Sequence, residues 1–242
     1  MRILVVNPNT TASMTGKIAA GARAVAAPGT EIIAVSPLDG PASIEGYYDE
    51  VFAIPGMIGE MQKAGPVDAT VIACFDDTGL DAARSFSDSP VIGIGEAGFH
   101  MASLVAGRFS VVTTLSRSIA ALEHNISKYG LASRCARVRA AEVAVLDLEK
   151  PGSAACDRIS EEIARALRED GAEAIVLGCA GMVDLAADLS RQHGVPVIDG
   201  VAAAVKLAEG LAGMGLKTSK VGGYARPLTK TYSGSMAKFS PR

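Results

Sequence analysis

Two cysteines are the residues of this sequence whose positions best suit chemistry. Cys74 ends the apolar run VDATVIAC, and Cys179 ends the apolar run GAEAIVLGC. Small and polar residues follow each cysteine, as they do where a strand gives way to a loop or a helix start. A helix start offers backbone N–H groups and the positive end of a dipole, which favour a thiolate. We therefore expect both thiols to be reactive.

A pair of thiols predicts a particular kind of proton chemistry. A thiolate is basic enough to remove a carbon-bound proton near neutral pH. If a second thiol faces it across a cleft, the proton is removed from one side of the carbon and returned to the other. That arrangement inverts a stereocentre without a cofactor or metal. The alternative for each cysteine is a packed, unreactive side chain, which is the commoner case for a single cysteine at a strand end.

The two cysteines occupy matched positions in an internal repeat. Arg2 and Arg108, which begin RILVVNPNTT and RFSVVTTLSR, are 106 residues apart. The segments PVIGI and PVIDG are also 106 residues apart, and the two cysteines are separated by 105. A shared offset indicates a duplicated unit. Cys135 and Cys156 have no partner at this offset, so we expect both to be structural.

The elements that position the thiols alternate between strands and helices in each half. Such alternation predicts an α/β fold with two similar domains, each with a mainly parallel sheet flanked by helices. In the first half we expect strands at 2–6, 30–37, 67–73 and 90–94, and helices at 11–27, 52–65 and around 80–85. Thr or Ser would cap the first helix, 38–50 would be a loop, and Pro55 would interrupt the second helix. Helices are also expected at 156–171 and 201–215.

The carboxyl ends of the strands bring several polar motifs together. Ligands bind there in open α/β sheets, so NPNT, CFDDT, TTLS and CAGM are candidate binding segments. Asn9 and Thr113, Thr114 or Ser116 could hydrogen-bond a small polar ligand, or they could cap helices. Asp76, with Asp77 beside it, could orient a substrate or order its loop.

Other function classes are disfavoured by the sequence. GIGEAG at 93–98 matches the dinucleotide pattern GxGxxG, but it comes late in the half and is weak evidence alone. The sequence has no CxxC pair and no histidine pair at ligand spacing, so a metal site is not expected. The net charge of −3 gives no attraction to nucleic acid, and no apolar run approaches the roughly 20 residues that span a membrane. We expect a cytoplasmic protein, where thiols stay reduced.

Six segments together resemble the hydantoin racemases of the aspartate/glutamate/hydantoin racemase superfamily. They are NPNT, SIEGYYDE, VIACFDDTGL, FSVVTTL, VLGCAGM and GVPVIDGVAAAVKL, and the resemblance runs from about residue 2 to residue 228. It implies racemisation of 5-monosubstituted hydantoins by two-base proton transfer, with Cys74 and Cys179 as the catalytic pair and no cofactor. Allantoin racemases are the closest sister group, and the sequence does not decide between the two substrates.

The resemblance also implies a domain arrangement and a set of binding residues. The first domain would be 1–97 with 205–228, the second 98–204, and 229–242 a flexible tail. A homo-oligomer is expected, with a small cyclic ureide as the partner of the site. The expected binding residues are Asn9, Ser43, Ile44, Phe75, Asp76, Thr113, Thr114, Gly178, Ala180 and Gly181.

Two alternatives from other classes stay open. Two α/β lobes around a cleft are also the shape of small-molecule binding proteins, which would not need a cysteine pair. A thiol-dependent hydrolase would need a histidine base beside one cysteine. None of the three histidines, His100, His124 and His193, lies beside either cysteine in the sequence.

Overall fold

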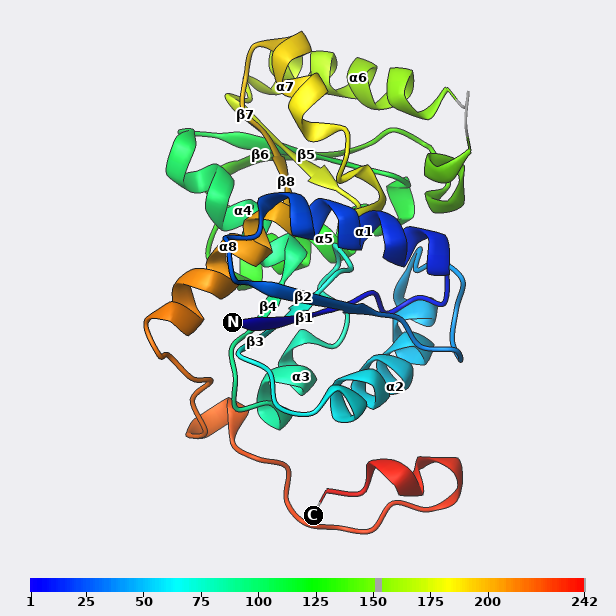
Figure 1. The fold of residues 1–242 in the computed structure, drawn as a ribbon. Helices are drawn as coiled ribbons and strands as arrows, with labels where there is room; N and C mark the ends of the chain where they lie inside the picture. The colour runs from blue at the N-terminus through cyan, green and yellow to red at the C-terminus, as the bar shows by residue number, and fades with distance from the viewer. Residues whose placement is uncertain (151–153, 242) are drawn as a thin grey trace.

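The structure, a computed structural model, describes residues 1–150 and 154–241 of the 242-residue chain. Residues 151–153, within the predicted second domain, and the last residue of the predicted tail lie outside the described part. The described residues form two four-stranded sheets, and every strand pair in them is parallel. The two sheets lie one above the other with helices between and outside them (Figure 1).

The first half contains four strands and four helices in alternation. The strands are β1 (Arg2–Val6), β2 (Glu31–Val35), β3 (Ala69–Ile72) and β4 (Val91–Gly93), in the sheet order β2-β1-β3-β4. The helices are α1 (Ala12–Val25), α2 (Tyr47–Ala64), α3 (Leu80–Phe86) and α4 (Ile94–Val105). β1 and β3 are the central strands and are buried almost throughout, as expected for a parallel sheet covered on both faces.

The second half repeats this arrangement. Its strands are β5 (Phe109–Thr113), β6 (Cys135–Ala140), β7 (Ala174–Gly178) and β8 (Val197–Asp199), in the order β6-β5-β7-β8. Its helices are α5 (Ile119–Lys128), α6 (Ala155–Arg165), α7 (Ala186–His193) and α8 (Gly200–Gly213). Each strand therefore has a counterpart four strands earlier in the same sheet position. The predicted duplication and fold class are confirmed.

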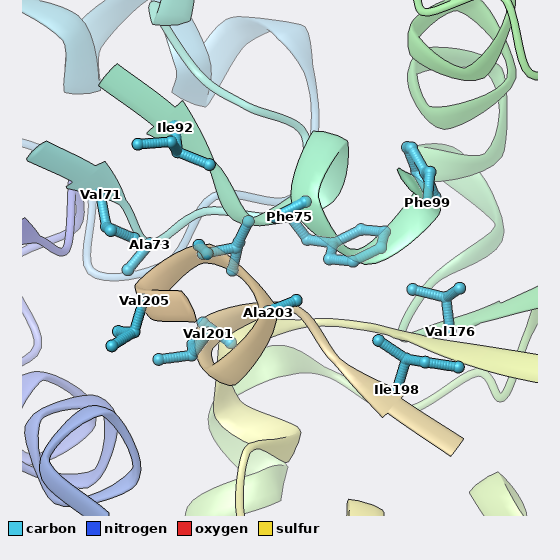
Figure 2. Close-up of a cluster of buried hydrophobic side chains, with 14 of the residues drawn as sticks. Val71, Ala73, Phe75, Ile92, Phe99, Val176, Ile198, Val201, Ala203 and Val205 are labelled. Carbon is cyan, nitrogen blue, oxygen red and sulfur yellow. The ribbon is translucent and has the colours of Figure 1, made fainter. Parts of the chain in front are cut away.

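The interior between the sheets is shared by both halves. In Figure 1, α1, α4, α5 and α8 lie between the sheets, whereas α2 and α3 lie outside the first sheet and α6 and α7 outside the second. One apolar cluster runs continuously through this layer. Figure 2 shows Val201 and Val205 of α8 beside Val71 of β3, with Val176 of β7 further along the same cluster. Because the halves share one core, the two sheets are held in a fixed relation.

Several local predictions are wrong in detail. α2 begins at Tyr47, inside the expected loop, and continues without interruption through Pro55. Thr11 occupies the N-cap position of α1, but its hydroxyl donates to the carbonyl of Ala42 and caps nothing. The expected strand at 90–94 ends at Gly93, and the unpredicted helix α4 starts at Ile94.

The chain beyond α8 returns to the first half. The Thr218 N–H donates to the Asp88 carbonyl at 2.9 Å, and the Lys220 ammonium donates to carbonyls of Arg84 and Ser87 at 2.6 Å. These hydrogen bonds hold the segment after α8 against the carboxyl end of α3. The domain boundaries and the flexible tail stay predictions, although a 3₁₀ turn, Gly234–Phe239, forms within that tail. Within the described residues, no helix is both long and apolar enough to span a membrane.

Candidate active site

The two thiols line the same small cavity. Cys74 follows β3 and Cys179 follows β7, so the duplicated sheets present them at equivalent strand ends. The cavity measures about 40 Å³, which is room for a few water molecules. Its walls come from both halves.

Most of the predicted binding residues lie in the cavity wall. Those that do are Asn9, Ile44, Phe75, Asp76, Thr113, Thr114, Gly178 and Ala180. Ser43 and Gly181 are absent from the described lining, although Gly181 bonds the Cys179 thiol through its N–H. Five further lining residues are not predicted from the sequence: Met14, Ala73, Ser118, Leu122 and Val145. Of these, Ser118 lies close to the TTLS motif and could have been found from it.

Burial dominates the acid–base behaviour of Cys74. The pKa of this thiol is raised well above its usual range, first by burial and then by the charge of Asp76 and a hydrogen bond to it. A hydrogen bond with Thr78 acts in the opposite direction but is the smaller effect. The expectation that the strand end favours the thiolate is therefore wrong for this cysteine. No helix starts directly after it, because α3 begins only at Leu80.

Cys179 has a milder environment. Burial raises the pKa of this thiol to about 11, while the Gly181 N–H and the charge of Lys17 lower it. A 3₁₀ turn, Ala180–Met182, follows Cys179 directly and supplies that N–H group. The expected thiolate is therefore not favoured at Cys179 either. Both thiols are protonated at rest and, once ionised, are stronger bases than an exposed thiol.

The carboxyl group of Asp76, next to Cys74, is paired with a second carboxyl group. Asp76 accepts hydrogen bonds from the N–H and hydroxyl groups of Thr78. Glu50 of α2 shares a hydrogen bond with Asp76, and burial followed by the charge of Asp76 raises the pKa of Glu50 to about 7. Among the described residues, Glu50 Oε1 is buried without a hydrogen-bond partner. The cavity therefore has an acceptor-rich side at Asp76.

The other polar wall residues are held by the fold. Asn9 Oδ1 accepts from Asn7 Nδ2 at 2.8 Å and from the Thr11 N–H at 3.0 Å. The Thr113 hydroxyl donates to the Gly178 carbonyl at 3.0 Å, which ties the ends of β5 and β7 together. Within the described part of the chain the Thr114 hydroxyl has no hydrogen-bond partner, so it is available to a ligand in the cavity.

The loop before α2 closes the cavity from the first half onto the second. Thr11 holds this loop through the Ala42 carbonyl at 2.7 Å, and Ile44 reaches the cavity wall. Glu45 Oε1 accepts the N–H of Val145 at 3.0 Å, and Val145 itself lines the cavity. This hydrogen bond joins the two halves across the opening.

The remaining cysteines and the histidines lie elsewhere. Cys135 is partly buried against the shared core, and burial raises the pKa of its thiol to about 12. Cys156 is exposed on α6. No histidine is among the cavity residues, and His193 Nε2 is hydrogen-bonded to Ser160 at 2.8 Å. Across residues 1–150 and 154–241, no cluster of His, Cys, Asp and Glu has a metal-binding arrangement.

The family model for Asp/Glu/hydantoin racemases matches residues 3–208. The chain belongs to this family. It is 50% identical over 236 residues to a hydantoin racemase of Rhizobium meliloti, covering 97% of this chain and 98% of that one. It is 48% identical over 241 residues to a hydantoin racemase of Pseudomonas sp. (strain NS671), covering 99% and 97%. An allantoin racemase structure from Klebsiella pneumoniae superposes with a TM-score of 0.96 at 49% identity and covers 100% of both chains.

These comparisons confirm the resemblance drawn from the six motifs. The racemase expected from the sequence is confirmed at the level of the family. The identities to a named allantoin racemase and to named hydantoin racemases are nearly equal, so they do not separate the two substrates.

Proposed function

We propose that this protein is a cofactor-independent racemase of 5-monosubstituted hydantoins. The observation that carries the proposal is the presence of Cys74 and Cys179 in one small cavity, each at the end of an equivalent strand. A binding protein would have no use for two thiols so placed. A thiol hydrolase would need a histidine base, and none lines the described cavity.

The chemistry follows from the two opposed bases. The C5 hydrogen of a hydantoin lies next to a carbonyl, so its removal gives an enolate. Loss of one proton from the pair to solvent leaves one cysteine as a thiolate, and this thiolate takes the C5 proton and becomes a thiol. The other cysteine, a thiol at the start, gives its proton to the opposite face of C5 and is left as a thiolate. The stereocentre is inverted, and the reverse reaction uses the same two groups with exchanged roles.

The cavity wall suits an uncharged ring that carries N–H groups. Its described residues include the carboxylate Asp76 but no lysine, arginine or histidine. Asp76 would accept a ring N–H, whereas the Thr114 hydroxyl and the Asn9 amide would bind carbonyl oxygens. Ser43, Ile44, Phe75, Thr113, Gly178, Ala180 and Gly181 complete the proposed site. A substrate with a free carboxylate would meet Asp76 without a compensating cation.

Allantoin is the second candidate substrate, because the allantoin racemase of Klebsiella pneumoniae aligns over the whole chain. Its ring is also a hydantoin, with a ureido group at C5. Rates measured with allantoin and with a 5-alkyl hydantoin, at equal enzyme concentration, decide between the two. We further propose that the protein is cytoplasmic and forms a homo-oligomer; light scattering on the purified protein would test the oligomeric state.

The two-thiol proposal is tested by replacing each thiol separately. Cys74→Ser and Cys179→Ser should each fail to racemise, because the carbanion cannot be reprotonated on the missing face. Each variant should still exchange the C5 hydrogen of one enantiomer with deuterium from solvent, with opposite choices in the two variants. Proton NMR in heavy water measures this exchange for each pure enantiomer after subtraction of the uncatalysed rate. Racemisation by either variant at the parent rate would refute the proposal.

A further inference from the structure

The duplicated halves stabilise two equivalent helix starts in different ways. The N-cap residue of α8 is Asp199, whose carboxylate accepts two backbone N–H groups of the first turn at 3.0 and 2.8 Å. The N-cap residue of α4, 106 residues earlier, is Gly93, which has no side chain to do this. The first turn of α4 therefore takes its acceptor from another part of the chain.

That acceptor is Asp77, three residues after Cys74. Asp77 Oδ1 accepts the N–H of Gly95 at 2.9 Å, and its Oδ2 accepts the N–H of Glu96 at 2.8 Å. The residue three positions after Cys179 is Met182, so the loop after Cys179 has no carboxylate at the matching position. The Cys74 loop is thus tied to the start of α4, and within residues 1–150 and 154–241 the Cys179 loop has no counterpart of this bond.

The Cys74 loop packs directly against the glycines of GIGEAG, where a side chain would leave it no room. A Cβ atom at Gly93 would lie 2.0 Å from Asp77 Oδ1, and one at Gly95 would lie 2.3 Å from the Phe75 carbonyl oxygen. Asp77 itself has φ of +56°, in the left-handed region that non-glycine residues rarely adopt. The motif that matched a dinucleotide pattern therefore serves to admit the Cys74 loop.

The second half holds the same loop from its other side. The Tyr129 hydroxyl donates to Asp77 Oδ2 at 2.7 Å, and Asn125 Nδ2 donates to the Asp76 carbonyl at 2.7 Å. Asn125 belongs to α5, and Tyr129 directly follows the carboxyl end of that helix. The Cys74 loop is accordingly fixed between α4 of its own half and α5 of the other.

We propose that Asp77 is a positioning residue that fixes the Cys74 thiol relative to the substrate and acts on only one of the two proton transfers. This inference rests on the proposed two-thiol function. Releasing the loop displaces Cys74 from C5, and a displacement of about 1 Å can cost about a hundredfold in rate. The loop that holds Cys179 is unchanged, so the rate of proton transfer by Cys179 stays the same.

The test gives α4 an aspartate at its own N-cap, as α8 has in the second half. In Asp77→Gly/Gly93→Asp the cap of α4 becomes local, and the glycine at 77 accepts the positive φ. The three atoms nearest a Cβ at Gly93 all belong to Asp77, so removing that side chain makes room for the new one. The double change is made in the Cys179→Ser protein, where Cys74 acts alone, and in the Cys74→Ser protein. We expect exchange of the C5 hydrogen to fall about ten- to a hundredfold in the first and by less than about twofold in the second.

The inference would be overturned if the double change lowered the exchange rate equally in the Cys179→Ser and Cys74→Ser proteins, or in neither of them. If neither single-thiol protein shows face-selective exchange before the double change is made, the proposed function fails instead. In that case the positioning of Cys74 is tested without substrate. The rates at which iodoacetamide labels Cys74 and Cys179 are compared between the parent protein and the double variant, both of which keep the two cysteines. The double change should alter the Cys74 rate at least about threefold and leave the Cys179 rate unchanged; any other pattern counts against the inference. Asp77→Asn, which tolerates the positive φ, replaces the double change in every arm if thermal unfolding shows that the double variant is not folded.

Discussion

Removing the Tyr129 hydroxyl isolates the contact through which the second half holds the Cys74 loop. In Tyr129→Phe the ring stays in its place near Phe99, 6.4 Å between centroids, so packing is retained. What is lost is one hydrogen bond of 2.7 Å to the buried carboxylate of Asp77. A hydrogen bond to a charged group contributes about 1.5–3 kcal/mol, so we expect the free energy of unfolding to fall by about 2 kcal/mol. For a chain of this length that corresponds to a melting temperature lower by about 4–8 °C.

The loss should depend on pH in a defined direction. Burial raises the pKa of Asp77 to about 7, and the Tyr129 hydroxyl lowers that pKa because it stabilises the ionised carboxylate. Removing the hydroxyl therefore raises the pKa of Asp77 further, and the variant binds more protons in the folded state near neutral pH. Since the hydrogen bond favours the ionised form, the destabilisation should be larger at pH 8 than at pH 6.

Urea unfolding at both pH values measures the effect. Tyr48→Phe is the control, because Tyr48 is 76% exposed and should lose almost nothing. In an Asp77→Asn background, Tyr129→Phe should cost much less than in the parent, which gives a coupling free energy between the two residues. A variant as stable as the parent at both pH values would refute the reasoning, as would an equal cost in the two backgrounds.

Three further outcomes are expected. Asp76→Asn should lower the pKa of Cys74, because the charge of Asp76 raises it, so labelling of Cys74 by iodoacetamide at pH 8 should become faster; a slower reaction would contradict this. Gly178→Ala should cost about 1–3 kcal/mol of stability, since its Cβ would lie 2.7 Å from that of Thr113, whereas Gly210→Ala, with nothing within 4 Å, should be neutral or stabilising; similar melting temperatures for the two would show that the sheet yields at this point. Racemisation should survive exhaustive chelation, and activity restored only by added metal would contradict the two-thiol chemistry.

The sequence predicts the two sheets and their duplication well, because these depend on repeated, local patterns. Short apolar runs ending at Pro or Asn mark the strands, and the common offset predicts the duplicated sheets. Helix α4 is missed because Gly95 and Gly98 lower helix propensity within its first turns. Tertiary packing outweighs that penalty, since a Cβ at Gly98 would come within 2.8 Å of Val176 on the other sheet. Only the assembled fold shows that these glycines are needed for contact.

The candidate site is predicted where its residues follow strand ends, and missed where they arrive from elsewhere. Asn9, Thr114 and Ala180 lie at strand ends, and their motifs point to the cavity. Leu122 belongs to the apolar face of α5, and its sequence pattern indicates only core. Val145 reaches the cavity through a bond with Glu45, 100 residues away, for which the sequence holds no signal.

The duplication places two thiols symmetrically, yet the residues around them make the two unequal. Cys74 lies beside the carboxylate of Asp76, which raises its pKa in addition to burial. Cys179 has the Gly181 N–H and the charge of Lys17, and both lower its pKa. The electrostatic surroundings of the two thiols therefore differ. A reaction whose two enantiomers are equal in energy does not require equal bases, because in the proposed mechanism each passage through the enolate uses both thiols and exchanges their charges. The loop anchored by Asp77 fits this inequality, since the thiol with the less favourable electrostatics is the one held more firmly.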